Sequence, residues 1–183
     1  MNEQTSPPLE TNEPPPPEEK AVQPSEAERP AFRAVQLLLP AASTSVTYAL
    51  LTINVLIFLA QYASLYTWGF DLPAAIGIKS NEMIAQGQYW RLFTPMFLHG
   101  SIVHIAFNMY ALYNLGRGLE RAYGHGRFLL LYLLSGFAGN VISMLFTPSP
   151  SLGSSTAIFG LLAAEGIFFY HNRGVYGQSA QRA

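Results

Sequence analysis

The chain has 183 residues, of which 50% are hydrophobic and 11% are charged, whereas ordinary soluble domains carry ~25% charged residues. This shortage of charge indicates a membrane protein. The absence of cysteine excludes disulfides, thiolate metal sites and cysteine nucleophiles, and the lack of a basic cluster interleaved with aromatic residues argues against nucleic-acid binding.

The amino-terminal region, residues 1–45, differs in composition from the rest of the chain. It contains eight prolines before residue 31, and residues 1–28 hold seven of the eleven acidic residues. Such a segment cannot bury enough apolar surface to offset the entropy lost on ordering. We predict a disordered Pro/Glu-rich tail, and its acidic start is unlike a secretory signal peptide.

Four apolar runs follow in chain order, at residues 46–64, 102–118, 127–147 and 154–170. The first has 19 residues without a charge. At ~1.5 Å per residue it is long enough to cross a ~30 Å hydrocarbon core. We therefore predict an all-α, polytopic membrane domain over residues 46–172, followed by a short cytoplasmic tail at residues 173–183.

The connection between the first two runs, residues 65–100, is too long to be an idle loop. It carries aromatic side chains of the kind that settle at the lipid interface. These are Trp68, Tyr89, Trp90, Phe93 and Phe97. We expect this connection to lie in the interfacial region.

The distribution of basic residues predicts the orientation in the membrane. With the amino terminus inside, the inner segments hold eight Lys and Arg residues, and the outer segments hold only Lys79 and Arg91. Because basic residues are retained on the cytoplasmic side, we expect a cytoplasmic amino terminus, in the plasma membrane.

Small residues recur in the last two runs, where they allow helix backbones to approach closely in lipid. They are Ser135, Gly136, Gly139, Gly160, Ala163, Ala164 and Gly166. We predict a compact helix bundle. Glu165, in the middle of the fourth run, needs a partner or faces lipid at a cost.

Two polar residues of the second run, His104 and Asn108, are four positions apart and therefore share one helix face. They either bond a neighbouring helix or stand as preorganised donors for a developing oxyanion. A metal site is not indicated, since the four histidines lack the HExxH spacing of zinc proteases.

The fourth run opens with Ser154 and Ser155 after Gly153. Either hydroxyl could cap the first turn of a helix. Alternatively, one of them is a nucleophile, because unpaired amides and a partial positive charge at a helix start stabilise an oxyanion. Gly153 would let a substrate backbone come close.

Two stretches, "YWRLFTPMFLHGSIVHIAFNMYALYNLGRGLERAYG" and "GSSTAIFG", together resemble the rhomboid intramembrane serine proteases. The resemblance covers roughly residues 46–172. It implies a rhomboid-like helical bundle with four of the usual six core transmembrane helices, and no metal or organic cofactor. It also implies cleavage of transmembrane protein substrates in the lipid bilayer; the substrate and the oligomeric state stay open.

The resemblance also implies roles for individual residues. Ser155 would be the nucleophile, and His104, Asn108 and the backbone amide of Ser155 would form the oxyanion hole beside Gly153. The other matching positions are Trp90 and Arg91 in the interfacial loop, His99 as a structural histidine, Glu120 and Gly124 at the inner turn, and Phe159 where the family places an aromatic ring against its catalytic histidine.

Two departures from the family pattern bear on activity. Thr156 stands where the family usually has glycine, which predicts a narrower or stiffer site. The family's histidine base lies on a later helix, and none of the histidines here replaces it: His171 is ~24 Å along the helix from Ser155. We expect an inactive or incomplete chain, the product of a truncated or frameshifted gene. The alternatives are a non-catalytic rhomboid-like protein that binds transmembrane helices, or a plain scaffold or transporter fragment.

Overall fold

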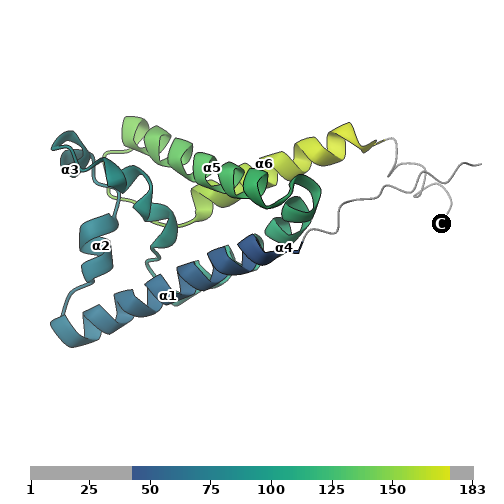
Figure 1. The fold of residues 1–183 in the computed structure, drawn as a ribbon. Helices are drawn as coiled ribbons and strands as arrows, with labels where there is room; N and C mark the ends of the chain where they lie inside the picture. The colour runs from purple at the N-terminus through teal and green to yellow at the C-terminus, as the bar shows by residue number, and fades with distance from the viewer. Residues whose placement is uncertain (1–42, 174–183) are drawn as a thin grey trace, which may run out of the picture. The chain divides into compact units, whose positions relative to one another are not determined.

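The computed structural model describes residues 43–173, so nearly all of the two predicted tails, residues 1–45 and 173–183, lies outside the described range. Figure 1 shows a helical domain. Its elements are α1 (Ser45–Trp68), α2 (Leu72–Gly77), α3 (Asn81–Ala85), the 3₁₀ helices η2 (Tyr89–Leu92) and η3 (Thr94–Phe97), α4 (Ile102–Tyr123), α5 (His125–Phe146) and α6 (Ser155–His171). One isolated antiparallel bridge joins Lys79 and Ser151.

The four long helices, α1, α4, α5 and α6, coincide with the four predicted apolar runs. Two of them continue beyond the predicted ends at residues 64 and 118. The polar and basic residues beyond these predicted ends are typical of a loop, but each helix continues to the next glycine that has a positive φ. These are Gly69 at 74° and Gly124 at 80°, a conformation that costs glycine little.

Length and apolar composition single out two of these helices. α1 and α5, with 24 and 22 residues, are long and apolar enough to cross a membrane. α4 is diluted by buried polar residues such as Asn108 and Glu120. The 17 residues of α6 span about 26 Å at the helical rise. We predicted four membrane-crossing helices, and helix length and apolar composition identify two of them, α1 and α5.

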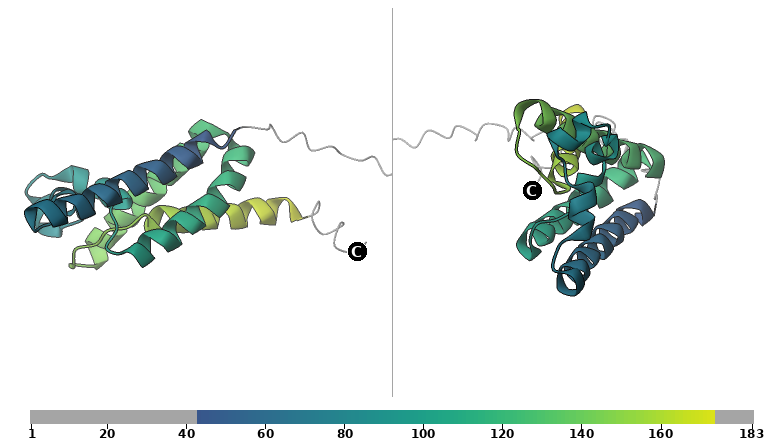
Figure 2. Two further views of the ribbon diagram at one scale, coloured as in Figure 1. Left: turned by 90° about the horizontal axis from the view of Figure 1, so that it is seen from below. Right: turned by 90° about the vertical axis from the view of Figure 1, so that its left-hand side faces the viewer.

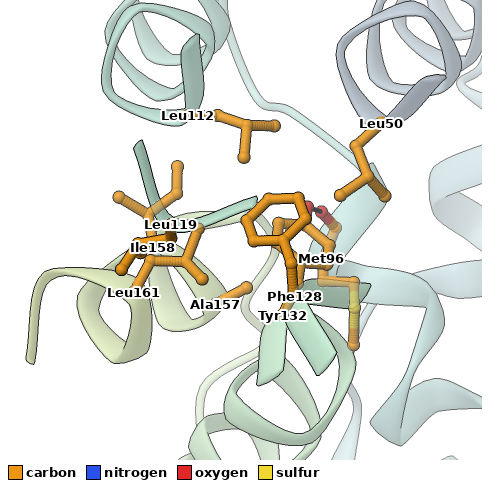
Figure 3. Packing of buried hydrophobic residues seen from close by; sticks show 9 residues of the cluster. All are labelled: Leu50, Met96, Leu112, Leu119, Phe128, Tyr132, Ala157, Ile158 and Leu161. Atoms are coloured by element: carbon orange, nitrogen blue, oxygen red, sulfur yellow. Dashed lines mark hydrogen bonds between the residues drawn. The ribbon is translucent and has the colours of Figure 1, made fainter. Parts of the chain in front are cut away.

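The bundle places α4 between α1 and α6, while α5 packs most extensively against α6 (Figure 2). Side chains from the four long helices and η3 form one buried cluster (Figure 3). Its members are Leu50, Met96, Leu112, Leu119, Phe128, Tyr132, Ala157, Ile158 and Leu161. This core fixes how α4 and α6 face each other.

Small residues bring α5 and α6 together. A methyl group added at Gly139 would lie 2.5 Å from Thr156 Cβ, and one added at Gly160 would overlap Ser135. The predicted close approach is therefore confirmed at these positions. It is wrong for Gly166, where a methyl group would meet no atom within 4 Å, because this residue lies on an exposed face of α6.

Candidate active site

The two serines at the start of α6 have different surroundings. Ser154 is the N-cap residue, but its hydroxyl makes no capping bond; it is buried, and its Oγ lies 3.3 Å from His99 Nε2. Ser155 is the first residue of the helix. The prediction that a serine hydroxyl caps this helix is wrong for Ser154, because His99 offers its side chain another partner.

Asn108 and Ser155 line one cavity of about 520 Å³ between α4 and α6. The remaining walls are mainly apolar. Asn108 is 7% exposed, and its Nδ2 is buried without a hydrogen-bond partner among the described residues. A buried amide donor without a partner is unfavourable, and most such groups in folded proteins are paired. Asn108 therefore lines the cavity with a buried donor that no described residue satisfies.

Gly153 brings His104 next to Ser155. Its φ of 127° disfavours any side chain, and a Cβ there would lie 2.6 Å and 2.7 Å from Cε1 and Nε2 of His104 and 3.7 Å from Ser155 Oγ. The imidazole therefore lies directly against the glycine backbone. The Ser101 hydroxyl caps α4 by accepting a hydrogen bond from His104 N at 3.1 Å. The His104 ring therefore lies on the first turn of α4, at the same end of the bundle as Ser155.

His99 lies behind these residues and is 2% exposed. Its main-chain N donates to Gln61 Oε1 at 3.0 Å, and its ring packs edge-on against His104 with centroids 5.3 Å apart. Burial, assisted by the neighbouring His104, lowers the pKa of His99 to about 4. The ring is therefore neutral near pH 7. In this form it links Ser154 to residues 69–101, which we call the interfacial segment.

Trp90 and Arg91 organise that interfacial segment. Trp90 Nε1 donates to Ile76 O at 3.1 Å, and the Arg91 guanidinium donates to Ile78 O at 2.9 Å and Ala75 O at 2.8 Å. Arg91 is 5% exposed. Both side chains therefore satisfy carbonyls around α2 rather than reaching the cavity.

Glu120 lies at the opposite end of α4 and is fully buried. Its carboxylate accepts from Val46 N at 2.8 Å, from Thr47 N at 2.8 Å, from Thr47 Oγ1 at 2.6 Å, and pairs with His125 Nδ1 at 2.6 Å. An anion at the start of a helix is favourable, so Glu120 fastens α1 to α4. Gly124 ends α4 one turn later.

Two further predicted residues lie along α6. Phe159 is 70% exposed and lines the cavity that holds Ser155. Thr156 points to Gly139 of α5 and is not part of the cavity wall. The predicted narrowing of the site by Thr156 is therefore not observed; its effect falls on the helix contact.

All four histidines of the sequence lie in the described part of the chain, and there no imidazole is hydrogen-bonded to Ser155 Oγ. His125 pairs with Glu120 at the other end of the bundle. His171 is the last residue of α6. The site therefore contains the Ser155 hydroxyl and nearby hydrogen-bond donors, but in the described part of the chain no imidazole is bonded to this hydroxyl to act as its base.

Two residues near the site were missed at the sequence level. Gln61 holds the backbone of His99, and Lys79 bonds the end of α5. The available signal for Lys79 was that it is one of only two basic residues in the predicted outer segments. A glutamine within an apolar helix, such as Gln61, gives a similar signal, because polar groups there need partners.

Comparison with known proteins agrees with this geometry. The rhomboid domain family matches residues 86–181, more than half of the chain. The chain belongs to the rhomboid family. It is thus a polytopic helical membrane protein of a family that includes intramembrane proteases.

Individual relatives show the same likeness. The rhomboid chain is 45% identical over 118 residues to "Rhomboid protease GluP" of Bacillus subtilis, which covers 64% of this chain and 23% of the relative. It is 35% identical over 141 residues to "Rhomboid-like protease 1" of Toxoplasma gondii, covering 73% and 48%. For "RHOMBOID-like protein 9, chloroplastic" of Arabidopsis thaliana the identity is 43% over 94 residues, covering 51% and 22%. The chain spans less than half the length of each of these relatives.

Proposed function

We propose that this chain carries the nucleophile and the oxyanion-binding groups of an intramembrane serine endopeptidase. Ser155 Oγ would attack a carbonyl carbon of an unwound segment of a transmembrane substrate. Asn108 Nδ2, the His104 ring and the Ser155 backbone N–H would stabilise the oxyanion, and water would release the acyl-enzyme.

The observation that carries this proposal is the unpartnered Asn108 amide in the cavity that also holds Ser155. A side chain that only joins helices is expected to bond a neighbouring helix. Asn108 instead keeps a buried donor free beside a hydroxyl at a helix N-terminus. This is the preorganised arrangement that a tetrahedral intermediate requires.

We further propose that the polypeptide as given cleaves poorly because no imidazole accepts the Ser155 proton. Loss of the base in a serine hydrolase costs ~10⁴- to 10⁶-fold in rate. The cavity of about 520 Å³ beside Ser155 has room for a small external base. A base supplied there would restore part of the reactivity.

The test is chemical rescue. The full chain in detergent micelles or proteoliposomes is treated with an alkyl fluorophosphonate, which bonds a reactive serine Oγ with loss of fluoride. We expect slow labelling alone and at least ~10-fold faster labelling with added imidazole, increasing as imidazole deprotonates near pH 7.

Ser155→Ala is the control and should abolish the rescued labelling, whereas Ser154→Ala should leave labelling of Ser155 in place. Labelling that imidazole does not accelerate, or that persists in Ser155→Ala, would rule out the proposed nucleophile. A transmembrane peptide substrate added under rescue conditions would then show whether the chain cleaves.

The alternative function is non-catalytic binding of transmembrane helices. It is favoured by the mainly apolar lining of the same cavity, in which Phe107 and Leu162 are exposed and Leu115 is half-buried. In this case Ser155→Ala keeps full binding of a transmembrane helix and no labelling appears with imidazole. The rescue experiment therefore separates the two functions.

The protein is integral to a membrane, and we propose that it lies in the plasma membrane with its amino terminus in the cytoplasm. The excess of basic residues in the predicted inner segments supports this orientation. Because the chain has no cysteine, Tyr66→Cys can be treated with a membrane-impermeant maleimide on intact cells. Labelling supports the proposal, and labelling only after permeabilisation contradicts it.

A further inference from the structure

Lys79 lies in the interfacial segment between α2 and α3, and its side chain is completely buried. Its ammonium donates to three main-chain carbonyls: Ser143 O at 3.3 Å, Thr147 O at 2.6 Å and Ser149 O at 3.0 Å. Because a lysine ammonium has three hydrogens, each has an acceptor. These acceptors lie on the last turn of α5 and the connection that follows it.

The acceptors explain how a buried cation is tolerated. In the described part of the chain Lys79 forms no ion pair with a carboxylate, since the one ion pair there joins His125 to Glu120. The last carbonyls of a helix carry partial negative charge, and α5 has no basic residue in its own last turn. Burial lowers the pKa of Lys79, while the three bonds favour its charged form.

The backbone of Lys79 also forms hydrogen bonds with the connection between α5 and α6, residues 147–154. Lys79 N donates to Ser151 O at 3.1 Å, and Ser151 N donates back to Lys79 O at 3.3 Å. Two residues later Gly153 N donates to Pro95 O at 2.9 Å. The connection is thus bonded to the interfacial segment at several points before Ser155.

We propose that Lys79 is a positioning residue for Ser155: it holds the connection 147–154 so that the hydroxyl faces the cavity beside Asn108. Without the ammonium, the carbonyls of Thr147 and Ser149 lose a shared partner, and the connection gains freedom. The consequence for catalysis rests on the proposed function, whereas the restraint itself does not.

The test measures distances between spin labels in the full chain, which is free of native cysteine. One pair, Tyr66→Cys with Ser149→Cys, joins exposed sites on α1 and the connection. A second pair, Tyr66→Cys with Leu134→Cys, reports on the helix frame. In Lys79→Met we expect the first distance distribution to broaden about twofold and the second to stay unchanged.

Two substitutions serve as matched controls. Asn81→Ala removes a neighbouring donor, the Asn81 amide, which bonds Met144 O at 2.8 Å and, more weakly, Thr147 O at 3.4 Å. The substitution leaves all three bonds of the Lys79 ammonium in place. Lys79→Arg retains a cation with hydrogens to donate. Both should keep the first distribution narrow. An unchanged distribution in Lys79→Met would overturn the proposal, and so would equal broadening of both pairs.

A thiol at the serine itself completes the test. In Ser155→Cys, the rate of modification by a small methanethiosulfonate should rise about fivefold when Lys79→Met is added, and change less than twofold with Asn81→Ala. An unchanged rate in Lys79→Met contradicts the proposal. Neither measurement requires turnover, so failure of this proposal and failure of the proposed protease chemistry give separate results.

Discussion

The two ends of α4 handle buried polar groups in opposite ways. Near the carboxyl-terminal end of α4, the inner end in the proposed orientation, Glu120 is fully buried and has a hydrogen-bond donor for each carboxylate oxygen. Toward the amino-terminal end, the outer end in that orientation, Asn108 is also buried, yet its amide nitrogen has no partner in the described structure. A buried polar group that is fully bonded stabilises the fold, whereas one left unbonded costs stability.

The largest effect is expected at the inner end. Glu120→Ala leaves Thr47 and His125 without their shared acceptor and removes the anion at the start of α1. We expect a loss of about 3 kcal/mol in the free energy of unfolding, measured by thermal unfolding in detergent. A loss below ~1 kcal/mol would show that Glu120 does not fasten the helices.

The matching change at the outer end is Asn108→Leu. Because it removes an unbonded buried donor, stability should stay within ~1 kcal/mol or rise. Imidazole-rescued labelling of Ser155 should fall ~100-fold, the cost typical of a lost oxyanion donor. A clear loss of stability with unchanged labelling would assign Asn108 to helix packing and end the contrast between the two ends.

The substitution Gly153→Ala tests whether the backbone next to Ser155, at the outer end, requires glycine. Gly153→Ala places a methyl group against His104 at a φ of 127°, so we expect a loss of about 1 to 2 kcal/mol. Gly166→Ala is the matched control, since that position is open. It should be neutral or stabilising by up to ~1 kcal/mol. Equal effects of the two substitutions would contradict this reading of Gly153.

The last prediction concerns the pH dependence of stability. The pKa of His99 is lowered to about 4 from its ordinary value of 6.5, so the unfolded chain binds a proton more readily than the folded chain. Stability should be complete above pH 6.5 and fall as pH decreases toward 4. Thermal unfolding of wild type and His99→Gln across this range should show a smaller pH dependence in the variant; identical slopes would exclude His99 as the source.

The sequence was sufficient to predict the long helices because each is a long, predominantly apolar run, and it predicted their starts better than their ends. The end of α1 was misplaced because interfacial aromatic residues suit either a loop or a helix, and only Gly69 decides the matter. The family resemblance selected Ser155, His104 and Asn108 as site residues. The structure brings them to one end of the bundle.

Other features depend on contacts that no local pattern encodes. The hydroxyl of Ser154 could have capped α6, but a histidine 55 residues earlier in the chain takes it. Lys79 bonds a helix end 64 to 70 residues away, which composition alone does not reveal. Thr156 looked like an obstacle in the site, and only the packing of α5 against α6 shows that it faces Gly139.

The most direct measurement is the mass of the peptides obtained after fluorophosphonate treatment in the presence of imidazole. We predict a single phosphonyl adduct on Ser155 and an unmodified Ser154 in the same peptide. An adduct on Ser154, or none on either residue in a folded chain, would contradict the assignment of Ser155 as the reactive hydroxyl.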